Sequence, residues 1–385
     1  MIRLCNMRRF FNKSIRQPLY AFRVFNRRLR AYFYYQLGDG RSSYPESVTL
    51  FLTHRCNLKC RMCGQWGRDG VTKKQDAQYI NSEIPINDMI SIIGDLAAFR
   101  PNITLFGGEP LLYRGCVDII RRIKEKGMHC LMITNGSLVE ENAKDIVDSA
   151  LDELNVSLDG PRDLHDSIRA LPGLFDRIMR GLKKVAAFKT DMKKKRPMVN
   201  LQCTITKYNY RDLEQLLDVA DAAEADSLTF HNLIFLDHYT LDKQKAFDEV
   251  LECVSADWEG FKFEPGIDPE VLYDKIKKIL SLKHRFSVDF YPNFQQAALM
   301  EYYRNTGISA GTGSSRRCLS PWVTAYIFPD GEVRPCLNSS YSYGSVLNDK
   351  FIALWNNEKA VRFRRFLKEK RAFPVCKRCT ELYRY

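Results

Sequence analysis

"SVTLFLTHRCNLKCRMCGQWG", residues 47–67, places three cysteines directly after a short run rich in β-branched and apolar side chains. That run predicts a strand over residues 47–53. Cys56, Cys60 and Cys63 follow it with the spacing C-x3-C-x2-C. Four thiolates would close a structural zinc site or a complete iron–sulfur cage, whereas three leave one metal position open. An open position can bind a reactant, so the stretch indicates a reactive centre.

The bulk composition indicates an ordinary globular protein. The chain has 385 residues, of which 45% are hydrophobic and 27% charged, enough for a large α/β barrel and a small second domain. No apolar run approaches the ~18–20 residues that a membrane span needs, and arginines interrupt the apolar stretches that a signal peptide would require. Twelve cysteines without an export signal favour thiolate ligation over disulfides, so we expect a cytoplasmic protein.

Strand-like and helix-like segments alternate six times between residues 46 and 240. Apolar positions at helical spacing separate the strand-like runs, as in "INDMISIIGDLAAF" (86–99). After residues 47–53, the strand-like runs cover residues 102–110, 129–136, 153–160, 198–206 and 226–235. This order predicts an α/β fold with a parallel sheet, helices outside it and a site at the carboxyl ends of the strands.

The three-cysteine motif after a strand resembles that of the radical S-adenosylmethionine (radical SAM) family. In that family the three thiolates hold a [4Fe–4S] cluster whose open iron chelates the methionine end of S-adenosylmethionine (SAM). An electron from the cluster cleaves SAM to a 5′-deoxyadenosyl radical, which abstracts hydrogen from the substrate. The resemblance implies a partial (β/α)6 TIM-like barrel over residues 46–240, with Cys56, Cys60 and Cys63 as the cluster ligands.

Other strand ends carry residues that the same resemblance assigns to SAM. The glycines of "GGEP" (107–110) let a ligand approach the backbone, and the glutamate can meet an ammonium group. The family uses the matching element for the methionine amine, and the next strand ends for the carboxylate or ribose. The implied SAM-binding residues are Gly107, Gly108, Glu109, Pro110, Asn135, Ser157 and Asp159, with Thr204 as a further candidate. Met62 departs from the family, which often has an aromatic residue there, so the adenine contact would fall to the backbone or Trp66.

A second group of cysteines lies in the last 68 residues, within a predicted C-terminal domain at 316–385. Cys318 and Cys336 flank an Asp330-Gly331 pair that predicts a hairpin, and Cys376 and Cys379 form a C-x2-C motif. The group resembles the twitch domain, a short form of the SPASM extension, which carries one auxiliary [4Fe–4S] cluster suited to electron transfer. A zinc ribbon is the alternative.

We expect residues 241–315, between the barrel and the C-terminal domain, to be mostly helical, with a linker at 309–315.

The remaining cysteines are Cys5, Cys116, Cys130, Cys203 and Cys253. Cys203 lies on the fifth predicted strand and is a candidate hydrogen donor to a substrate radical, although buried free cysteine is also a common core residue. His231 and His238, near the end of the sixth strand, are proton-acceptor candidates with a structural role as the alternative.

Residues 1–45 form a basic, aromatic extension. Nine of the first 40 residues are Lys or Arg and one is acidic, and "PLYAFRVFNRRLRAYFYYQLG" (18–38) predicts a helix between proline and glycine. One helical face holds Phe22, Phe25, Leu29, Tyr32 and Phe33, and another holds Arg23, Arg27 and Arg30. The segment fits peripheral contact with the inner membrane surface, or a helix docked on its own barrel with the arginines in solvent. RNA contact ranks last because no RNA-binding module accompanies it.

The leading functional hypothesis is a radical SAM oxidoreductase-type enzyme whose auxiliary cluster accepts an electron. We expect dehydrogenation or epimerisation of a sugar or aminocyclitol, with flavodoxin or ferredoxin as reductant. The alternatives are a peptide maturase, for which residues 1–45 are too short to form a leader-binding winged helix, and an enzyme acting on a lipid or lipid-linked glycan. A non-catalytic iron–sulfur scaffold is the remaining alternative. Such a protein would need neither the GGEP motif nor a cluster with an open iron position.

Overall fold

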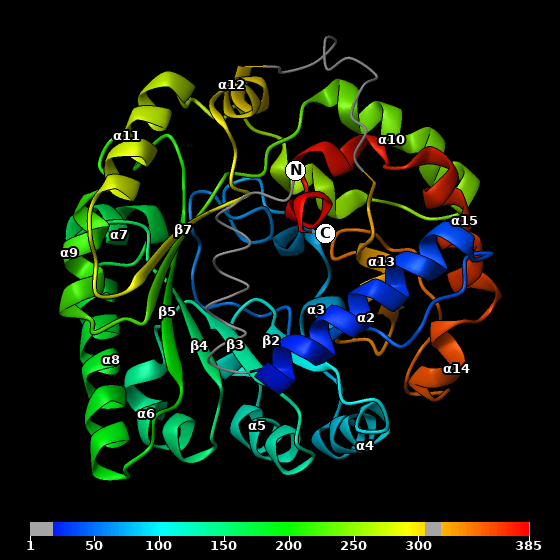
Figure 1. The fold of residues 1–385 in the computed structure, drawn as a ribbon, viewed down its shortest axis with the longest axis horizontal. Coiled ribbons are helices and arrows are strands. Elements are labelled where there is room, and N and C mark those ends of the chain that lie inside the picture. Colours follow the sequence, from blue (N-terminus) through cyan, green and yellow to red (C-terminus); the bar gives the residue numbers. More distant parts are fainter. Residues whose placement is uncertain (1–17, 305–316, 385) are drawn as a thin grey trace.

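A single nine-stranded sheet runs through the molecule (Figure 1). The computed structural model describes residues 18–304 and 317–384. Across the sheet the strands lie in the order β7-β6-β5-β4-β3-β2-β1-β8-β9. Their bounds are β1 Ser47–Phe51, β2 Asn102–Phe106, β3 Cys130–Thr134, β4 Glu153–Ser157, β5 Met198–Thr204, β6 Ser227–His231, β7 Ser287–Tyr291, β8 Thr324–Ile327 and β9 Val333–Arg334.

Every neighbouring pair from β7 to β8 is parallel, and only β8 and β9 are antiparallel. The predicted α/β class is therefore confirmed: the sheet curves like part of a barrel but does not close. The hairpin predicted from Asp330-Gly331 also forms, with Tyr326 opposite Arg334.

The expectation of a mostly helical region at 241–315 missed one strand. This region supplies β7, which extends the parallel sheet beyond β6. Its "SVDFY" segment has five residues and only one fully buried side chain, so its alternation is too short to stand out among helical patterns. The predicted linker at 309–315 and Cys5 lie outside the described residues.

Helices cover the outer face of the curved sheet (Figure 1). Val48 and Leu50 of β1 are completely buried and belong to the main hydrophobic core, which burial of apolar area stabilises. The helices of this part are α3 Ala77–Ile80, α4 Ile86–Leu96, α5 Cys116–Glu125, α6 Val139–Asp148, α7 Arg162–Arg169, α8 Leu174–Asp191, α9 Gln215–Ala222, α10 His238–Leu251, α11 Pro269–Ser281 and α12 Gln296–Arg304. The short 3-10 helices are η1 Thr72–Lys74, η2 Pro110–Leu112, η3 Ala256–Phe261, η4 Pro374–Arg378 and η5 Thr380–Tyr383.

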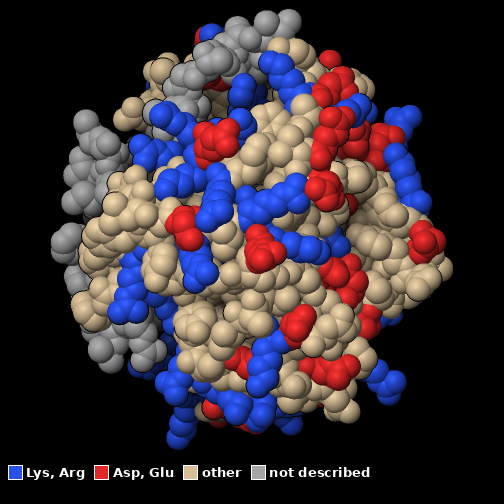
Figure 2. Space-filling view, turned by 90° about the vertical axis from the view of Figure 1, so that its right-hand side faces the viewer, with Lys and Arg blue, Asp and Glu red and all other residues tan. Residues whose placement is uncertain are grey.

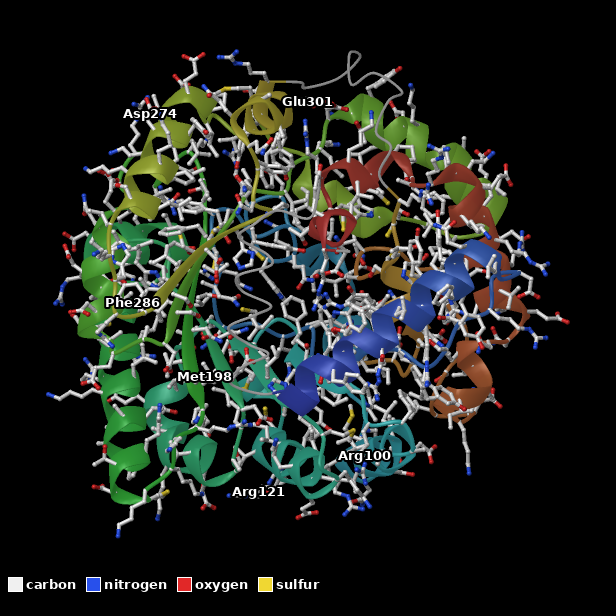
Figure 3. All side chains as sticks on the ribbon, viewed as in Figure 1. Arg100, Arg121, Met198, Asp274, Phe286 and Glu301 are labelled. Atoms are coloured by element: carbon white, nitrogen blue, oxygen red, sulfur yellow. The ribbon has the colours of Figure 1, made fainter. Side chains whose placement is uncertain are left out.

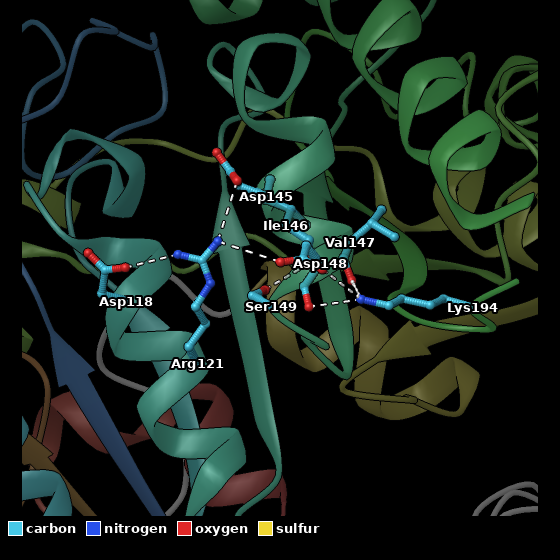
Figure 4. A network of polar contacts seen from close by, with 8 residues as sticks. All are labelled: Asp118, Arg121, Asp145, Ile146, Val147, Asp148, Ser149 and Lys194. Atoms are coloured by element: carbon cyan, nitrogen blue, oxygen red, sulfur yellow. Dashed lines mark hydrogen bonds and ion pairs between the residues drawn. The ribbon is translucent and has the colours of Figure 1, made fainter. Parts of the chain in front are cut away.

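Exposed ion pairs join neighbouring helices at the outside of the sheet (Figure 4). Arg121 of α5 binds Asp118 at 2.9 Å on its own helix and Asp145 of α6 at 3.4 Å. Lys194, after α8, binds Asp148 at the end of α6 at 3.1 Å. Such exposed pairs contribute little stability individually, so the buried face of each helix holds the outer layer in place.

Helix α2 (Pro18–Leu37) packs on the C-terminal part of the chain, which adds α13 (Ser320–Val323), α14 (Phe351–Trp355) and α15 (Glu358–Lys370). Ala31 and Tyr35 are buried there, and the Tyr35 ring meets the edge of Trp322 with centroids 4.9 Å apart. The helix therefore docks on its own protein, as one of the three interpretations expected, although Arg27 and Arg28 contact the protein and do not point to solvent. The described helices include none that is long and apolar enough to cross a membrane.

Candidate functional site

The three cysteines lie in a loop, residues 53–67, that follows β1 and is held by the loop after β2. The Gly108 amide donates to the Thr53 carbonyl at 2.8 Å, and the Glu109 amide donates to the Arg55 carbonyl at 2.9 Å. A Cβ atom on Gly108 would lie 2.2 Å from the Arg55 carbonyl oxygen. The glycines are thus needed because two backbone segments touch, a reason other than the ligand approach expected from the sequence.

Glu109 joins this loop to the one after β3. Its side chain is fully buried and accepts hydrogen bonds from the Thr134 hydroxyl at 2.7 Å and from the Asn135 amide at 2.7 Å. Burial raises the pKa of Glu109, and these donors oppose that rise. Pro110 begins η2, whose Leu111 amide also donates to Glu109. The sequence-predicted residues of GGEP and Asn135 are therefore in direct contact.

Asn135 faces the cysteine loop. Its Nδ2 lies 2.9 Å from Asn57 Oδ1 and 3.9 Å from the Cys56 sulfur. Asn57 in turn donates to the Ser137 hydroxyl at 2.9 Å. Sequence reasoning missed Asn57, although its place directly after Cys56 could have drawn attention to it.

A buried ion pair between Asp159, in the loop after β4, and Arg169, the last residue of α7, also reaches the cysteine loop. Asp159 is completely buried and accepts from Arg169 Nε at 2.6 Å and from the Thr204 amide at 2.9 Å. Arg169 Nη1 lies 3.9 Å from the Cys60 sulfur. Both oxygens of Asp159 thus already have protein partners, Thr204 contributes its backbone, and Arg169 is a site residue that the sequence analysis missed.

The three thiols sit close enough together to influence one another. Cys60 is buried, and Cys56 and Cys63 are half-buried. Burial raises the pKa of Cys56 to about 12, with smaller contributions from Cys60, Glu109 and Cys63. A thiolate there needs compensating positive charge, which bound iron would supply.

Trp66 lies near the C-terminal end of the cysteine loop, residues 53–67. Its amide donates to the Cys63 sulfur at 3.3 Å, its indole donates to the His54 carbonyl at 2.8 Å, and Lys59 lies 3.5 Å above its ring. Its interactions therefore hold the loop's own backbone around Cys63.

Ser157, at the end of β4, is half-buried.

The four C-terminal cysteines also converge. Cys318 and Cys376 are buried, and the Cys379 amide donates to the Cys376 carbonyl at 3.0 Å. Burial raises the pKa of Cys318, and the charges of the other three thiols raise it further. Cys253, from the connecting region, lies near Cys336 and contributes to the pKa of that thiol.

The donor chemistry of both groups fits iron–sulfur clusters. Within residues 18–304 and 317–384, no three Cys, His, Asp or Glu side chains are arranged to hold a single metal ion. Thiolate sulfur is the usual ligand of a four-iron cluster, in which each thiolate binds a different iron.

The connecting region contacts both cysteine groups. In η3, a Cβ on Gly260 would lie 1.9 Å from the Gly64 carbonyl, next to Cys63. A few residues earlier, the Val254 amide donates to the Ser340 hydroxyl at 2.9 Å, four residues after Cys336. Segment 253–261 therefore bridges the two loops, a role for which the sequence gave no signal.

An aromatic layer lies between the two groups, on the sheet face opposite the outer helices. Phe51, Tyr326 and Phe328 form it, with Phe51 and Phe328 stacked at 5.2 Å between centroids. Burial raises the pKa of Tyr326, and so do the nearby Glu381 carboxylate and the Cys379 and Cys336 thiols. Tyr326 thus reaches from this layer to the C-terminal cysteines.

Of the weaker candidates, Cys203 is connected to Asp159 through Asn209, whose Nδ2 donates to the Asp159 carbonyl at 2.8 Å. Cys203 is completely buried on the same side of β5 as Val199 and Leu201, in the main core, and Asn209 Nδ2 lies 3.5 Å from its sulfur. His231 packs edge-on against Tyr291 at 5.9 Å, and His238 is exposed at the start of α10. The hydrogen-donor role of Cys203 and the proton-acceptor roles of His231 and His238 stay predictions.

Two family models match this chain: the radical SAM superfamily over residues 50–220, and the SPASM iron–sulfur cluster-binding domain over residues 318–380. The chain belongs to the radical SAM superfamily. Together the matches span more than half of the chain and include both cysteine groups. The protein is thus a radical SAM enzyme with a SPASM domain. Its cofactors are SAM, a SAM-binding [4Fe–4S] cluster and auxiliary iron–sulfur binding in the SPASM domain.

Relatives of this radical SAM enzyme carry diverse names. It is 32% identical over 190 residues to Fe-coproporphyrin III synthase of Methanosarcina barkeri, covering 49% of this chain but only 44% of that relative. It is 25% identical to the AdoMet-dependent heme synthase of Nitratidesulfovibrio vulgaris, covering 89% and 86% of the two chains. The probable GTP 3',8-cyclase of Sulfurisphaera tokodaii is 28% identical over 76% of this chain and 81% of its own.

Solved structures share the fold. Streptococcus suis SuiB bound to S-adenosylmethionine superposes with a TM-score of 0.61 at 15% identity, covering 88% of this chain and 72% of SuiB. Native anSMEcpe with bound AdoMet gives a TM-score of 0.53 at 18% identity, covering 82% of each chain. At such identities the likeness concerns the fold alone.

Proposed function

We propose that Cys56, Cys60 and Cys63 hold the SAM-binding cluster and that the four C-terminal cysteines hold one auxiliary cluster. The convergence of three thiols, Asn135 and the Arg169–Asp159 pair at the ends of β1, β3 and β4 carries this proposal. When bound, the cluster supplies the electron that cleaves SAM to a 5′-deoxyadenosyl radical.

The protein's own residues then have distinct tasks. Glu109 fixes the loops after β1, β2 and β3 relative to one another, and the one lone-pair site that its three donors leave on the carboxylate can meet the methionine ammonium. Arg169 keeps a fixed positive charge beside the thiolate of Cys60, where it offsets negative charge. By resemblance, Ser157 and Asn135 are the candidates for the carboxylate or ribose, whereas Asp159 acts through Arg169.

The substrate we propose is a polar small molecule of the sugar or aminocyclitol class, oxidised by two electrons. Abstraction of a hydrogen atom by the 5′-deoxyadenosyl radical, loss of a proton to solvent and loss of one electron would give the oxidised product. An auxiliary cluster held by Cys318, Cys336, Cys376 and Cys379 would supply the electron acceptor. A polar row on the inner sheet face supports this class. Asn200 Nδ2 donates to Asn155 Oδ1 at 2.8 Å and Asn200 Oδ1 accepts from the Ser227 hydroxyl at 2.6 Å. A few polar side chains placed in this way can fix the orientation of a hydroxyl-bearing ligand.

Reconstitution with iron and sulfide under anaerobic conditions tests the proposal. SAM, a reductant and fractions of host extract are added, and 5′-deoxyadenosine is measured. Stimulation by the polar-metabolite fraction is expected. Stimulation by the peptide fraction alone, or by the lipid fraction alone, would replace the proposed substrate with a peptide or a lipid-linked glycan. No 5′-deoxyadenosine from fully loaded protein would reject the enzymatic assignment.

A further inference from the structure

Helix α2 is fixed on the protein by two of its arginines, the reverse of the orientation that the docked-helix interpretation expected. Arg28 makes a bidentate pair with the buried carboxylate of Glu46, at 2.7 and 2.9 Å. Arg27 donates to the carbonyls of Phe99 and Arg100, and Figure 3 labels Arg100 after the end of α4, below α2. Two of the helix's basic side chains thus face the protein, and the apolar face turns outward.

The outward face of α2 is an exposed aromatic stripe. Phe22 is 64%, Phe25 51% and Phe33 52% exposed. These positions follow helical spacing, so their rings lie along one side of the helix, opposite the buried Ala31 and Tyr35. The stripe consists of Phe22, Phe25, Leu29, Tyr32 and Phe33. Leaving five large apolar side chains in water side by side is unfavourable, which indicates a surface made to be covered.

We propose that this aromatic stripe docks the enzyme on an anionic lipid bilayer surface. Phenylalanine and leucine can enter the boundary between headgroups and acyl chains, and tyrosines are favoured at headgroup level. Tyr34 and Arg30 are exposed next to the stripe and can reach the headgroups. This proposal does not depend on the substrate assigned above.

The charge distribution favours lipid as the occupant. Residues 1–40 carry nine Lys or Arg and one acid, and α2 itself has four arginines and no acid. On the face shown in Figure 2, by contrast, basic and acidic side chains are interspersed. The positive excess is thus concentrated in the sequence around the aromatic stripe, and about 1 kcal/mol per basic residue is typical for attraction to anionic leaflets.

Vesicle sedimentation of the reconstituted full chain tests the proposal. Vesicles of phosphatidylcholine alone are compared with vesicles containing about 30% phosphatidylglycerol, at low and high salt. The triple variant F25S/L29S/F33S removes the centre of the aromatic stripe. The matched control L280S/L282S removes two exposed leucines at the end of α11, on the other side of the molecule.

We expect wild type and the control to bind the anionic vesicles. The variant F25S/L29S/F33S should bind them at least about tenfold more weakly. Arg30→Glu should weaken binding mainly at low salt. Equal binding by the triple variant, or equal binding of wild type to neutral vesicles, would overturn the proposal. So would a wild-type dimer in sedimentation velocity that the triple variant abolishes, because a second copy would then cover the stripe. SAM cleavage without added substrate is expected to be the same in all these proteins, so a failed radical assignment would be visible separately.

Discussion

Arg169 Nη1 lies 3.9 Å from the Cys60 sulfur, and its Nε is held at 2.6 Å by Asp159, which is completely buried. One charged pair thus connects the end of β4, the last turn of α7 and the cysteine loop. The Arg61 amide strengthens this connection by donating to the Ile168 carbonyl at 2.9 Å. The pair positions a cation where negative charge accumulates.

Replacing Arg169 should damage the SAM-cluster site selectively. Arg169→Gln leaves Asp159 charged and without its cationic partner, a change that costs about 3–5 kcal/mol for buried pairs. We expect a lower melting temperature and a loss of about half of the bound iron, since only one of two four-iron clusters should suffer. Arg169→Lys should recover part of both. Full iron content and unchanged SAM cleavage in Arg169→Gln would reject the positioning role.

Removing each cysteine group should affect one cluster. The variant C56A/C60A/C63A should lose SAM cleavage but keep an auxiliary cluster detectable by electron paramagnetic resonance. The variant C376A/C379A should keep reductive SAM cleavage but lose net turnover of substrate. Cleavage that survives the first variant contradicts the ligand assignment, and full turnover in the second contradicts the electron-accepting role.

Gly260 should be intolerant of any side chain. A Cβ there would meet the Gly64 carbonyl at 1.9 Å, so Gly260→Ala must push η3 away from the cysteine loop. We expect a destabilisation of about 1–3 kcal/mol and weaker SAM binding, with the auxiliary cluster unchanged. Gly94→Ala in α4 is the matched control, because no atom lies within 4 Å of its Cβ, and it should be neutral or stabilising by up to about 1 kcal/mol. Equal behaviour of the two variants in thermal unfolding and SAM binding would show that the close approach is unimportant.

The sequence predicted β1 to β6 because each carries a dense apolar run ending at a turn, whereas β7, with one buried side chain, was missed. Predicted strands 102–110 and 153–160 correspond to β2 and β4 followed by site loops. The contacts of Glu109 with Asn135 follow from parallel topology, which brings strand ends together.

What the sequence could not indicate depends on tertiary contact. The bridge made by segment 253–261 arises from a close backbone approach, and the local sequence around Gly260 resembles any turn. Arg169 is one of 59 basic residues, and only the fold brings it to Cys60. The sequence also did not predict which face of α2 packs on the protein, because helical periodicity defines two faces without showing which one is covered.

Acid should destabilise the protein through His165. This imidazole is buried beside α8, its Nδ1 accepts from the Asp159 amide at 3.1 Å, and burial lowers its pKa from 6.5 to about 4. The folded state therefore disfavours the protonated ring, while the unfolded chain binds a proton below about pH 6.5. Stability should fall by up to about 1.4 kcal/mol per pH unit between about pH 6.5 and 4, with no further loss from this group below that window.

Pulse proteolysis at pH 7.5 and 5.5 measures the effect of acid on the stability of the protein. His165→Gln should be less stable than wild type at pH 7.5 but lose less stability on acidification, and an identical pH slope in both proteins would assign the acid sensitivity to other groups.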